Sequence, residues 1–365
     1  MTSTKFILVG ARQDKHNKKH PGGVLTLSAG LIDYATAHGF EIEVIDTYRS
    51  SFDKSISFID NMKQGLRRIK SLVRLFRNES FAGVIIFSGA GVGFYERIVM
   101  SLVCRWYKTR DLFVIVDGWF LQVEKAGFFK RSVVKLLLKI PYKLGASGKN
   151  WARFFRSLEV PDHKILEVKY WLPASFTVAA VPKTALPQKP LKFIFIGWMI
   201  REKGLNEIIG SISALYNKYP FSFVLIGGGT MLEEVRTVIT TQHWEERVSA
   251  LGWVDDAKFE KEISSSDIFV LPSYAEGFPM SLIEAMSKGL PAICSNVGGI
   301  SDSVIHKENG YLVTPRSTEE LIRGMTYYLE SPDLRLEQHS RKTLDIVKQN
   351  HDCETNCRLY FDTFR

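Results

Sequence analysis

The stretch IFVLPSYAEGFPMSLIEAMSKG, residues 268–289, decides the fold. The apolar run 268–271 predicts a strand, and a turn with one glycine separates it from a helix that we expect to begin near Pro279. A strand, a turn and a helix in this order are typical of a parallel α/β sheet. The first amides of such a helix have no partners within it, so this segment predicts an anion site beyond the strand.

The same alternation of strand and helix patterns runs through the rest of the chain. It occupies the first half, stops at a proline-rich stretch, 172–190, and restarts at 193. We therefore predict an α/β fold made of two Rossmann-like domains that face each other across a cleft. The expected division is an N-terminal domain, a linker, a C-terminal domain and final helices that pack back on the first domain, at 1–175, 176–190, 191–335 and 336–365.

Composition narrows the class of protein. The chain has 365 residues, 45% of them hydrophobic, and its four cysteines form no disulfide framework, so we expect a cytoplasmic globular protein. The formal net charge of +9 is uneven, because residues 1–180 hold 28 Lys and Arg against 15 Asp and Glu. A basic half suits an anionic partner such as nucleic acid or a membrane surface, or it serves solubility alone.

Two carboxylates flank the expected anion site. Glu276 falls in the turn after the strand, and Glu284 falls about a turn and a half into the helix. Their spacing suits a sugar ring on one side of the anion and ribose hydroxyls on the other. Lys203 follows a second strand, which ends at Gly197, and is placed to reach the anion as a point charge.

These residues resemble a known family. Glu276 and Glu284, with seven residues between them, resemble the Glu-x7-Glu signature of the retaining GT-B glycosyltransferases of family four, also called glycosyl transferases group 1. The resemblance covers nearly the whole chain and is strongest from 192 to 315. It implies that Glu284 binds the donor ribose, that Glu276 contacts the transferred sugar, and that the turn helps to hold the donor through Gly277, Phe278, Pro279 and Met280.

The resemblance also assigns the cations. It implies that Lys203 meets the donor diphosphate, and the family places an arginine where this chain has Trp198. Either Arg201 or a residue of the first domain would then supply the second cation. The catalytic set implied in this way is Glu276, Lys203 and Asp117, the last standing at the end of a strand where many relatives carry a histidine.

Four further positions are expected to bind the donor. Gly228 lies in a three-glycine turn that sits beside the nucleotide in the family, and Val254 ends a segment, 251–254, that resembles the family segment whose backbone meets the base. Gly22 and Gly23 precede a helix of the first domain, where the family places a glycine pair that faces the donor.

The resemblance implies a retaining, metal-independent glycosyltransferase. The chain has no Asp-x-Asp motif and no P-loop motif, so we expect no metal and no cofactor, with the nucleotide sugar as a substrate. A UDP-sugar is the favoured donor from family frequency, and the acceptor would be a glycan or a lipid-linked glycan of cell-surface polysaccharide synthesis. The alternatives are a nucleotide-sugar epimerase of the same two-domain plan and a non-enzymatic basic binding protein.

Two basic amphipathic segments, 62–77 and 128–139, suggest peripheral attachment to the inner face of a membrane rather than nucleic-acid binding. In the first segment, Leu66, Ile69, Val73 and Phe76 are expected to share one apolar face. The alternative is that both helices only cover the sheet and leave their cations in water.

Overall fold

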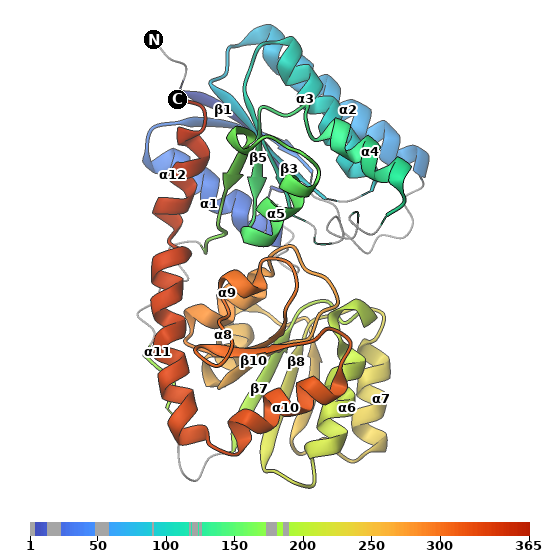
Figure 1. Ribbon diagram of the computed structural model, residues 1–365, viewed down its shortest axis with the longest axis vertical. Coiled ribbons are helices and arrows are strands. Elements are labelled where there is room, and N and C mark those ends of the chain that lie inside the picture. The colour runs from blue at the N-terminus through green and yellow to red at the C-terminus, as the bar shows by residue number, and fades with distance from the viewer. Residues whose placement is uncertain are drawn as a thin grey trace. The chain divides into compact units, whose positions relative to one another are not determined.

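The computed structural model describes residues 4–12, 23–47, 58–89, 91–116, 118, 123, 126–172, 181–184 and 190–365. The chain forms two compact units, Met1–Pro173 with Asp352–Arg365, and Ala174–His351 (Figure 1). Each unit contains a six-stranded parallel sheet with helices between successive strands. The predicted α/β class and the two Rossmann-like units are confirmed.

The first unit has the strand order β2-β1-β3-β4-β5-β6. From β1 the chain moves one way to β2, then returns past β1 and continues in the other direction to β6. Because crossovers between parallel strands are right-handed, α1 covers one face of the sheet, and α2, α3 and α4 cover the other. The elements are β1 Lys5–Gly10, α1 Gly23–Ala37, β2 Glu41–Asp46, α2 Phe58–Asn78, β3 Gly83–Ser88, α3 Val92–Trp106, β4 Asp111–Ile115, α4 Phe128–Leu137, β5 Lys143–Ala146, α5 Lys149–Ser157 and β6 Ile165–Glu167.

Residues 336–365, which we expected to pack on the first domain, are divided between the units. The helix α11 (Pro332–Asn350) belongs to the second unit, and α12 (Cys353–Asp362) belongs to the first, where it packs on α1. The ring of Phe361 stacks on Tyr34 and Phe40, at centroid distances of 5.3 and 5.2 Å, and meets Phe6 edge-on at 4.9 Å. An aromatic cluster therefore holds the end of the chain to the sheet at its beginning.

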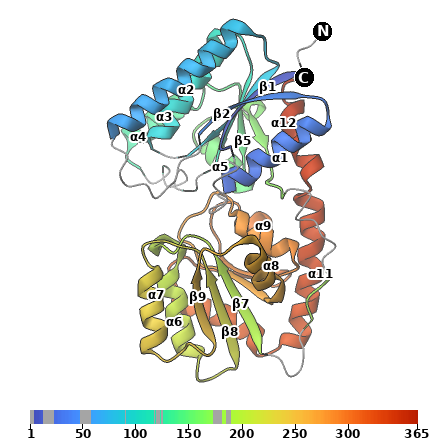
Figure 2. The same cartoon turned by 180° about the vertical axis from the view of Figure 1, so that it is seen from behind.

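The second unit has the strand order β12-β11-β10-β7-β8-β9. Its sheet is buried on both faces, which accounts for the continuous apolar runs in its central strands. Figure 2, the view from behind, shows α6 and α7 beside β8 and β9. The elements are β7 Leu191–Ile196, α6 Leu205–Leu215, β8 Phe221–Ile226, α7 Leu232–Thr241, β9 Val248–Gly252, α8 Asp256–Ser265, β10 Ile268–Leu271, α9 Met280–Ser287, β11 Ala292–Ser295, β12 Gly310–Val313, α10 Thr318–Leu329 and α11.

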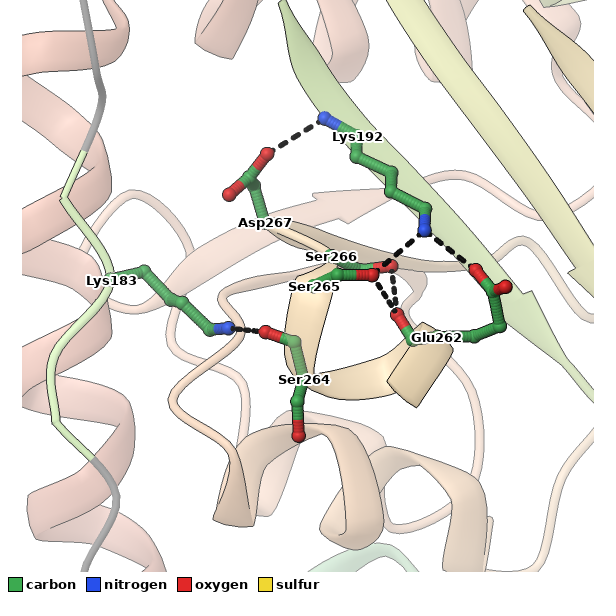
Figure 3. Close-up of polar contacts among 7 residues, drawn as sticks. All are labelled: Lys183, Lys192, Glu262, Ser264, Ser265, Ser266 and Asp267. Atoms are coloured by element: carbon green, nitrogen blue, oxygen red, sulfur yellow. Dashed lines mark hydrogen bonds and ion pairs between the residues drawn. The ribbon is translucent and has the colours of Figure 1, made fainter. Parts of the chain in front are cut away.

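A polar network fixes the amino ends of β7 and β10 (Figure 3). The Asp267 carboxylate accepts a 2.8 Å hydrogen bond from the Lys192 amide, and the Lys192 ammonium lies 2.6 Å from Glu262 and 2.8 Å from the Ser265 hydroxyl. Lys183 donates to the carbonyl of Ser264. Because these groups satisfy one another at the amino end of the strands, we assign them a structural role and look for function at the carboxyl end.

The aromatic cluster around α12 predicts a large loss of stability on truncation. We expect Phe361→Ala to destabilise the first unit by about 3–5 kcal/mol, because it removes a buried ring and leaves a cavity. Leu359→Ala, an exposed position of the same helix, should change stability by less than about 0.5 kcal/mol. Urea unfolding of the whole chain, followed by fluorescence, compares the two variants. Equal effects would contradict this role of Phe361.

Candidate functional site

The order of strands in the second unit creates a switch point between β7 and β10. These two strands are parallel neighbours, and the chain leaves β7 toward β8 on one side and β10 toward β11 on the other. Loops that follow neighbouring strands of this kind diverge and leave room for a ligand at the carboxyl edge. Residues 197–204 and 272–279 are the two loops at this point.

An ion pair joins the two loops. The ammonium of Lys203 lies 2.5 Å from Oε1 of Glu276, and the Glu276 side chain is buried whereas that of Lys203 is partly exposed. The Tyr274 amide also donates a 2.8 Å hydrogen bond to the Glu202 carbonyl. The structure thus brings together two residues that are 73 positions apart and that the sequence analysis placed in one catalytic set.

Two glycines allow the backbones to approach closely around this ion pair. Gly204 has φ +77°, and a Cβ at this position would lie 2.3 Å from the carbonyl oxygen of Pro272. Gly298 has φ +57°, and its Cβ would lie 2.0 Å from the carbonyl oxygen of Glu276. Any side chain at either position would displace the loop that carries Glu276.

Tyr274 was not singled out by the sequence analysis, yet it ties this loop to α6. Its hydroxyl lies 3.0 and 3.1 Å from the two carboxylate oxygens of Glu207, which is buried, and the Arg316 guanidinium lies 4.7 Å from its ring centroid. Burial and the Glu207 carboxylate raise the pKa of Tyr274, and the nearby guanidinium of Arg201 opposes the shift. Arg201 itself is exposed beside Tyr274. No sequence motif signals this arrangement, because its partners lie in separate elements.

The helix α9 begins directly after the loop of Glu276, as predicted from the sequence. Pro279 is its N-cap residue and provides no side-chain cap. Within the described part of the chain, the amides of Met280 and Ser281 donate no hydrogen bond. The side chains of Phe278 and Met280 are buried, so this turn is anchored while its free amides can meet an anion.

Glu284 differs from Glu276 in its surroundings. Its side chain is only partly buried in α9, and no described residue pairs with its carboxylate. Burial raises its pKa to about 7. A carboxylate without a protein partner at this depth can accept hydrogen bonds from hydroxyl groups of a ligand.

The three-glycine turn after β8 packs against the loop after β7. A Cβ on Gly227 would lie 1.8 Å from the carbonyl oxygen of Gly197, and the Gly228 carbonyl accepts a 2.8 Å hydrogen bond from the Met199 amide. Both glycines lie at the carboxyl edge of the sheet; Gly227 has φ +139° and a backbone oxygen where its Cβ would lie, so glycine is needed at that position.

An aromatic pair occupies the place of the arginine expected from the family pattern. The ring of Trp198 meets that of Trp253 edge-on, with centroids 5.0 Å apart, and Trp253 also packs against Gly228. Val254, the next residue, is partly buried against the core of the unit. Trp198 therefore adds apolar surface at this edge and contributes no positive charge.

The remaining predicted site residues belong to the first unit. Gly23 is the first residue of α1. Gly22 and Asp117 lie outside the described residues, so their predicted roles stay predictions.

Part of the chain is similar in sequence to known glycosyltransferases. Residues 179–343 match the sequence model of the glycosyl transferases group 1. An uncharacterized glycosyltransferase of Haemophilus influenzae is 31% identical over 45% of this chain, and the chain spans about half, 48%, of that relative. A Campylobacter jejuni N,N'-diacetylbacillosaminyl-diphospho-undecaprenol alpha-1,3-N-acetylgalactosaminyltransferase is 25% identical over 69% of this chain and 70% of its own length.

The solved structures show the same fold over the whole chain. Anabaena HepE, crystallised with UDP and glucose, aligns with 98% of this chain and 98% of its own chain at a TM-score of 0.70 and 16% identity. At this identity the likeness establishes the fold alone. Over residues 179–343 the chain is similar in sequence to the glycosyl transferases group 1, and its fold is that of the GT-B glycosyltransferases.

Proposed function

We propose that this chain is a retaining glycosyltransferase that moves a sugar from a nucleoside diphosphate donor, with UDP favoured, to a glycan or lipid-linked glycan. The observation that carries the proposal is the Lys203–Glu276 pair at the switch point, next to the start of α9, which has no side-chain cap, and to Glu284, whose carboxylate has no partner among the described residues. The family of the second unit supports the same reading.

The site must first stabilise the negative charge that develops on the leaving diphosphate. Breaking the bond between the sugar and the diphosphate places positive charge on the sugar and negative charge on the phosphate oxygens. Lys203 is partly exposed, so it can turn from Glu276 toward a phosphate and neutralise that charge, while the amides of Met280 and Ser281 donate hydrogen bonds to it. Arg201, which is exposed nearby, is the candidate for a second cation.

The sugar and the ribose are assigned to the two carboxylates. Glu276, held in place by Lys203 and by the close packing of Gly298, would position the sugar through its hydroxyl groups. Glu284 would accept hydrogen bonds from the ribose hydroxyls, because it has no partner among the described residues. Asp117 remains the proposed sugar ligand from the first unit.

We propose that transfer retains the configuration of the sugar. The acceptor would attack from the side of the leaving group, and the departing phosphate would take the acceptor proton, so Glu276 is not needed as a nucleophile. The reaction is proposed to need no metal and no cofactor, because Lys203 and the helix amides meet the diphosphate charge and the chain has no Asp-x-Asp motif. Full activity in excess EDTA is the expected result.

The acceptor is proposed to be lipid-linked. The Campylobacter relative is named for a diphospho-undecaprenol acceptor, and we propose a related acceptor here, in cell-surface polysaccharide synthesis. No helix in the described ranges is both long and apolar enough to span a bilayer. We therefore propose peripheral attachment to the cytoplasmic face of a membrane.

Thermal-shift measurements with UDP, GDP, ADP and a panel of their sugars test the donor class. A ligand that binds only the folded chain raises its stability by about 2.7 kcal/mol at a hundredfold excess over the dissociation constant. Stabilisation by UDP-sugars and transfer to a lipid-linked acceptor are expected. Conversion of the donor to another nucleotide sugar without an acceptor would show an epimerase instead.

Removing the Lys203 ammonium should weaken donor binding. We expect Lys203→Ala to lower UDP affinity by about 10- to 100-fold, because a charge-assisted hydrogen bond contributes roughly 1.5–3 kcal/mol. This change also leaves a buried carboxylate unpaired, so stability should fall. Adding Glu276→Gln removes that charge, and the double variant should regain stability but not UDP affinity in calorimetry. Recovery of both would mean that Lys203 serves the fold alone.

Neutralising Glu276 should affect turnover more than nucleotide binding. We expect Glu276→Gln to lower kcat by about 10²–10³, the range for losing one preorganised electrostatic contact to the reacting group. The affinity for free UDP should change less than about threefold, since the proposed contacts are to the sugar. A parallel loss of UDP affinity would place Glu276 at the nucleotide.

The raised pKa of Glu284 predicts a pH dependence of donor binding. The ribose hydroxyls donate to the ionised carboxylate, so donor affinity should fall as the pH drops through about 7. Binding at pH 7 should also release protons, which appears in calorimetry as a dependence of the heat on the buffer. The Glu284→Gln variant should bind the donor more weakly at pH 8, and its binding heat should no longer depend on the buffer through this proton release. An unchanged pH profile in this variant would refute the assignment.

A further inference from the structure

Large apolar side chains lie exposed on the outer face of α3. They recur every three or four residues along the whole helix, which places them on one face. The opposite face supplies Phe94, Ile98 and Cys104 to the core of the first unit, so α3 is apolar on both faces. The exposed set is Val92, Tyr95, Val99, Leu102 and Trp106.

The neighbouring helices extend this apolar face. α2 packs beside α3, and Figures 1 and 2 both show α2, α3 and α4 together along one side of the first unit. The first half of α2 exposes three apolar side chains, and the start of α4 exposes two phenylalanine rings, Phe128 at 88% and Phe129 at 81%. We call the exposed apolar residues of these three helices the α2–α4 surface; α2 and α4 contribute Ile59, Met62, Leu66, Phe128, Phe129 and Leu136.

This arrangement corrects one expectation from the sequence. Leu66, Ile69, Val73 and Phe76 were expected to share one apolar face of α2 for a membrane. Instead, Ile69 and Phe76 pack against the core, as the covering of the sheet requires, and Leu66 is exposed. The apolar surface available to a partner is supplied by α3 and by the first parts of α2 and α4.

Cations surround the apolar residues. α2 carries six Lys and Arg residues against one acidic residue, Asp60, and α4 carries three against none. Lys63, Arg67, Lys70 and Arg74 follow the exposed apolar residues of α2 at helical spacing and are themselves exposed. The α2–α4 surface is therefore apolar at its centre and basic beside it.

We propose that the α2–α4 surface docks on a bilayer that contains anionic phospholipid, an inference that rests on the lipid-linked acceptor of the proposed function. The positive charge of the α2–α4 surface favours an anionic bilayer over a second copy of the chain. A second copy placed face to face would bring like charges together, and the cores of protein interfaces are depleted in lysine. An anionic headgroup layer pairs with the cations, while Trp106, Phe128 and Phe129 suit the boundary between headgroups and acyl chains.

Flotation of the whole chain with vesicles tests the proposal. Vesicles of phosphatidylglycerol and phosphatidylcholine are compared with vesicles of phosphatidylcholine alone, at low and high salt. We expect binding to the anionic vesicles, at least tenfold weaker in 0.5 M salt and with the neutral ones. Equal binding to both vesicle types, or none to the anionic vesicles at low salt, overturns the proposal.

Two sets of variants locate the contact. Two multiple variants should each lower vesicle binding at least tenfold. The apolar set combines Trp106→Ser, Phe128→Ser and Phe129→Ser. The charge set combines Lys63→Gln, Arg67→Gln, Lys70→Gln and Arg74→Gln. The matched control, Val181→Ser with Ile305→Ser, removes exposed apolar side chains of the second unit and should bind as the parent chain does.

Two further measurements separate this proposal from the proposed function. UDP affinity should be equal in all three sets, because none touches the donor site, and the chain should have the same size in solution. Loss of vesicle binding with normal UDP binding supports the proposal. If the apolar set instead dissociates an oligomer and leaves vesicle binding intact, the surface joins copies of this chain and the proposal fails, while the transferase function is untouched.

Discussion

The contact between Lys203 and Glu276 is the interaction on which the site depends. It exists because β7 and β10 are neighbours, although Lys203 and Glu276 are 73 positions apart in the sequence, and because glycine at 204 and 298 lets three backbones meet. A buried carboxylate is costly unless it is paired, so the contact with Lys203 stabilises Glu276 in its turn. A diphosphate that draws Lys203 away would also change the charge beside the sugar. In the proposed function, donor binding and sugar positioning would therefore be coupled through this one ammonium.

The two glutamates of the motif lie in different environments within one strand–turn–helix unit. Glu276 lies in a turn that two neighbouring loops contact and pairs with Lys203, and Glu284 lies in the helix without a partner among the described residues. The first is thereby suited to hold a group through a reaction, and the second to exchange water for ligand hydroxyls. The short turn between them begins α9 with free amides. In the proposed function, one segment would thus offer three kinds of contact to one extended ligand.

Much of this could be predicted from the sequence, and the failures have a physical cause. Strand and helix periodicity predicted both sheets, and the family resemblance of Glu276, Glu284 and Lys203 implied that their loops serve one site. The hydrogen bond from Tyr274 to Glu207 could not be predicted, because it joins a loop to a helix that is distant in sequence, and only tertiary packing brings the two together. The division of 336–365 between the units depends on the aromatic contacts of Phe361, which periodicity does not reveal.

The face of α3 marks a limit of hydrophobic patterns. A helix that is apolar all round is typically buried on all sides, and the sequence patterns singled out the charged helices α2 and α4 but not α3. The sheet can cover only one face of a helix in an outer layer. When both faces of such a helix are apolar, one apolar face therefore stays exposed to solvent. The cations of α2 could not identify that face, since half of its apolar residues belong to the core. The solvent exposure of each side chain in the structure, and not the amphipathic pattern of the sequence, distinguishes a helix that only covers its own sheet from a helix that also exposes an apolar surface.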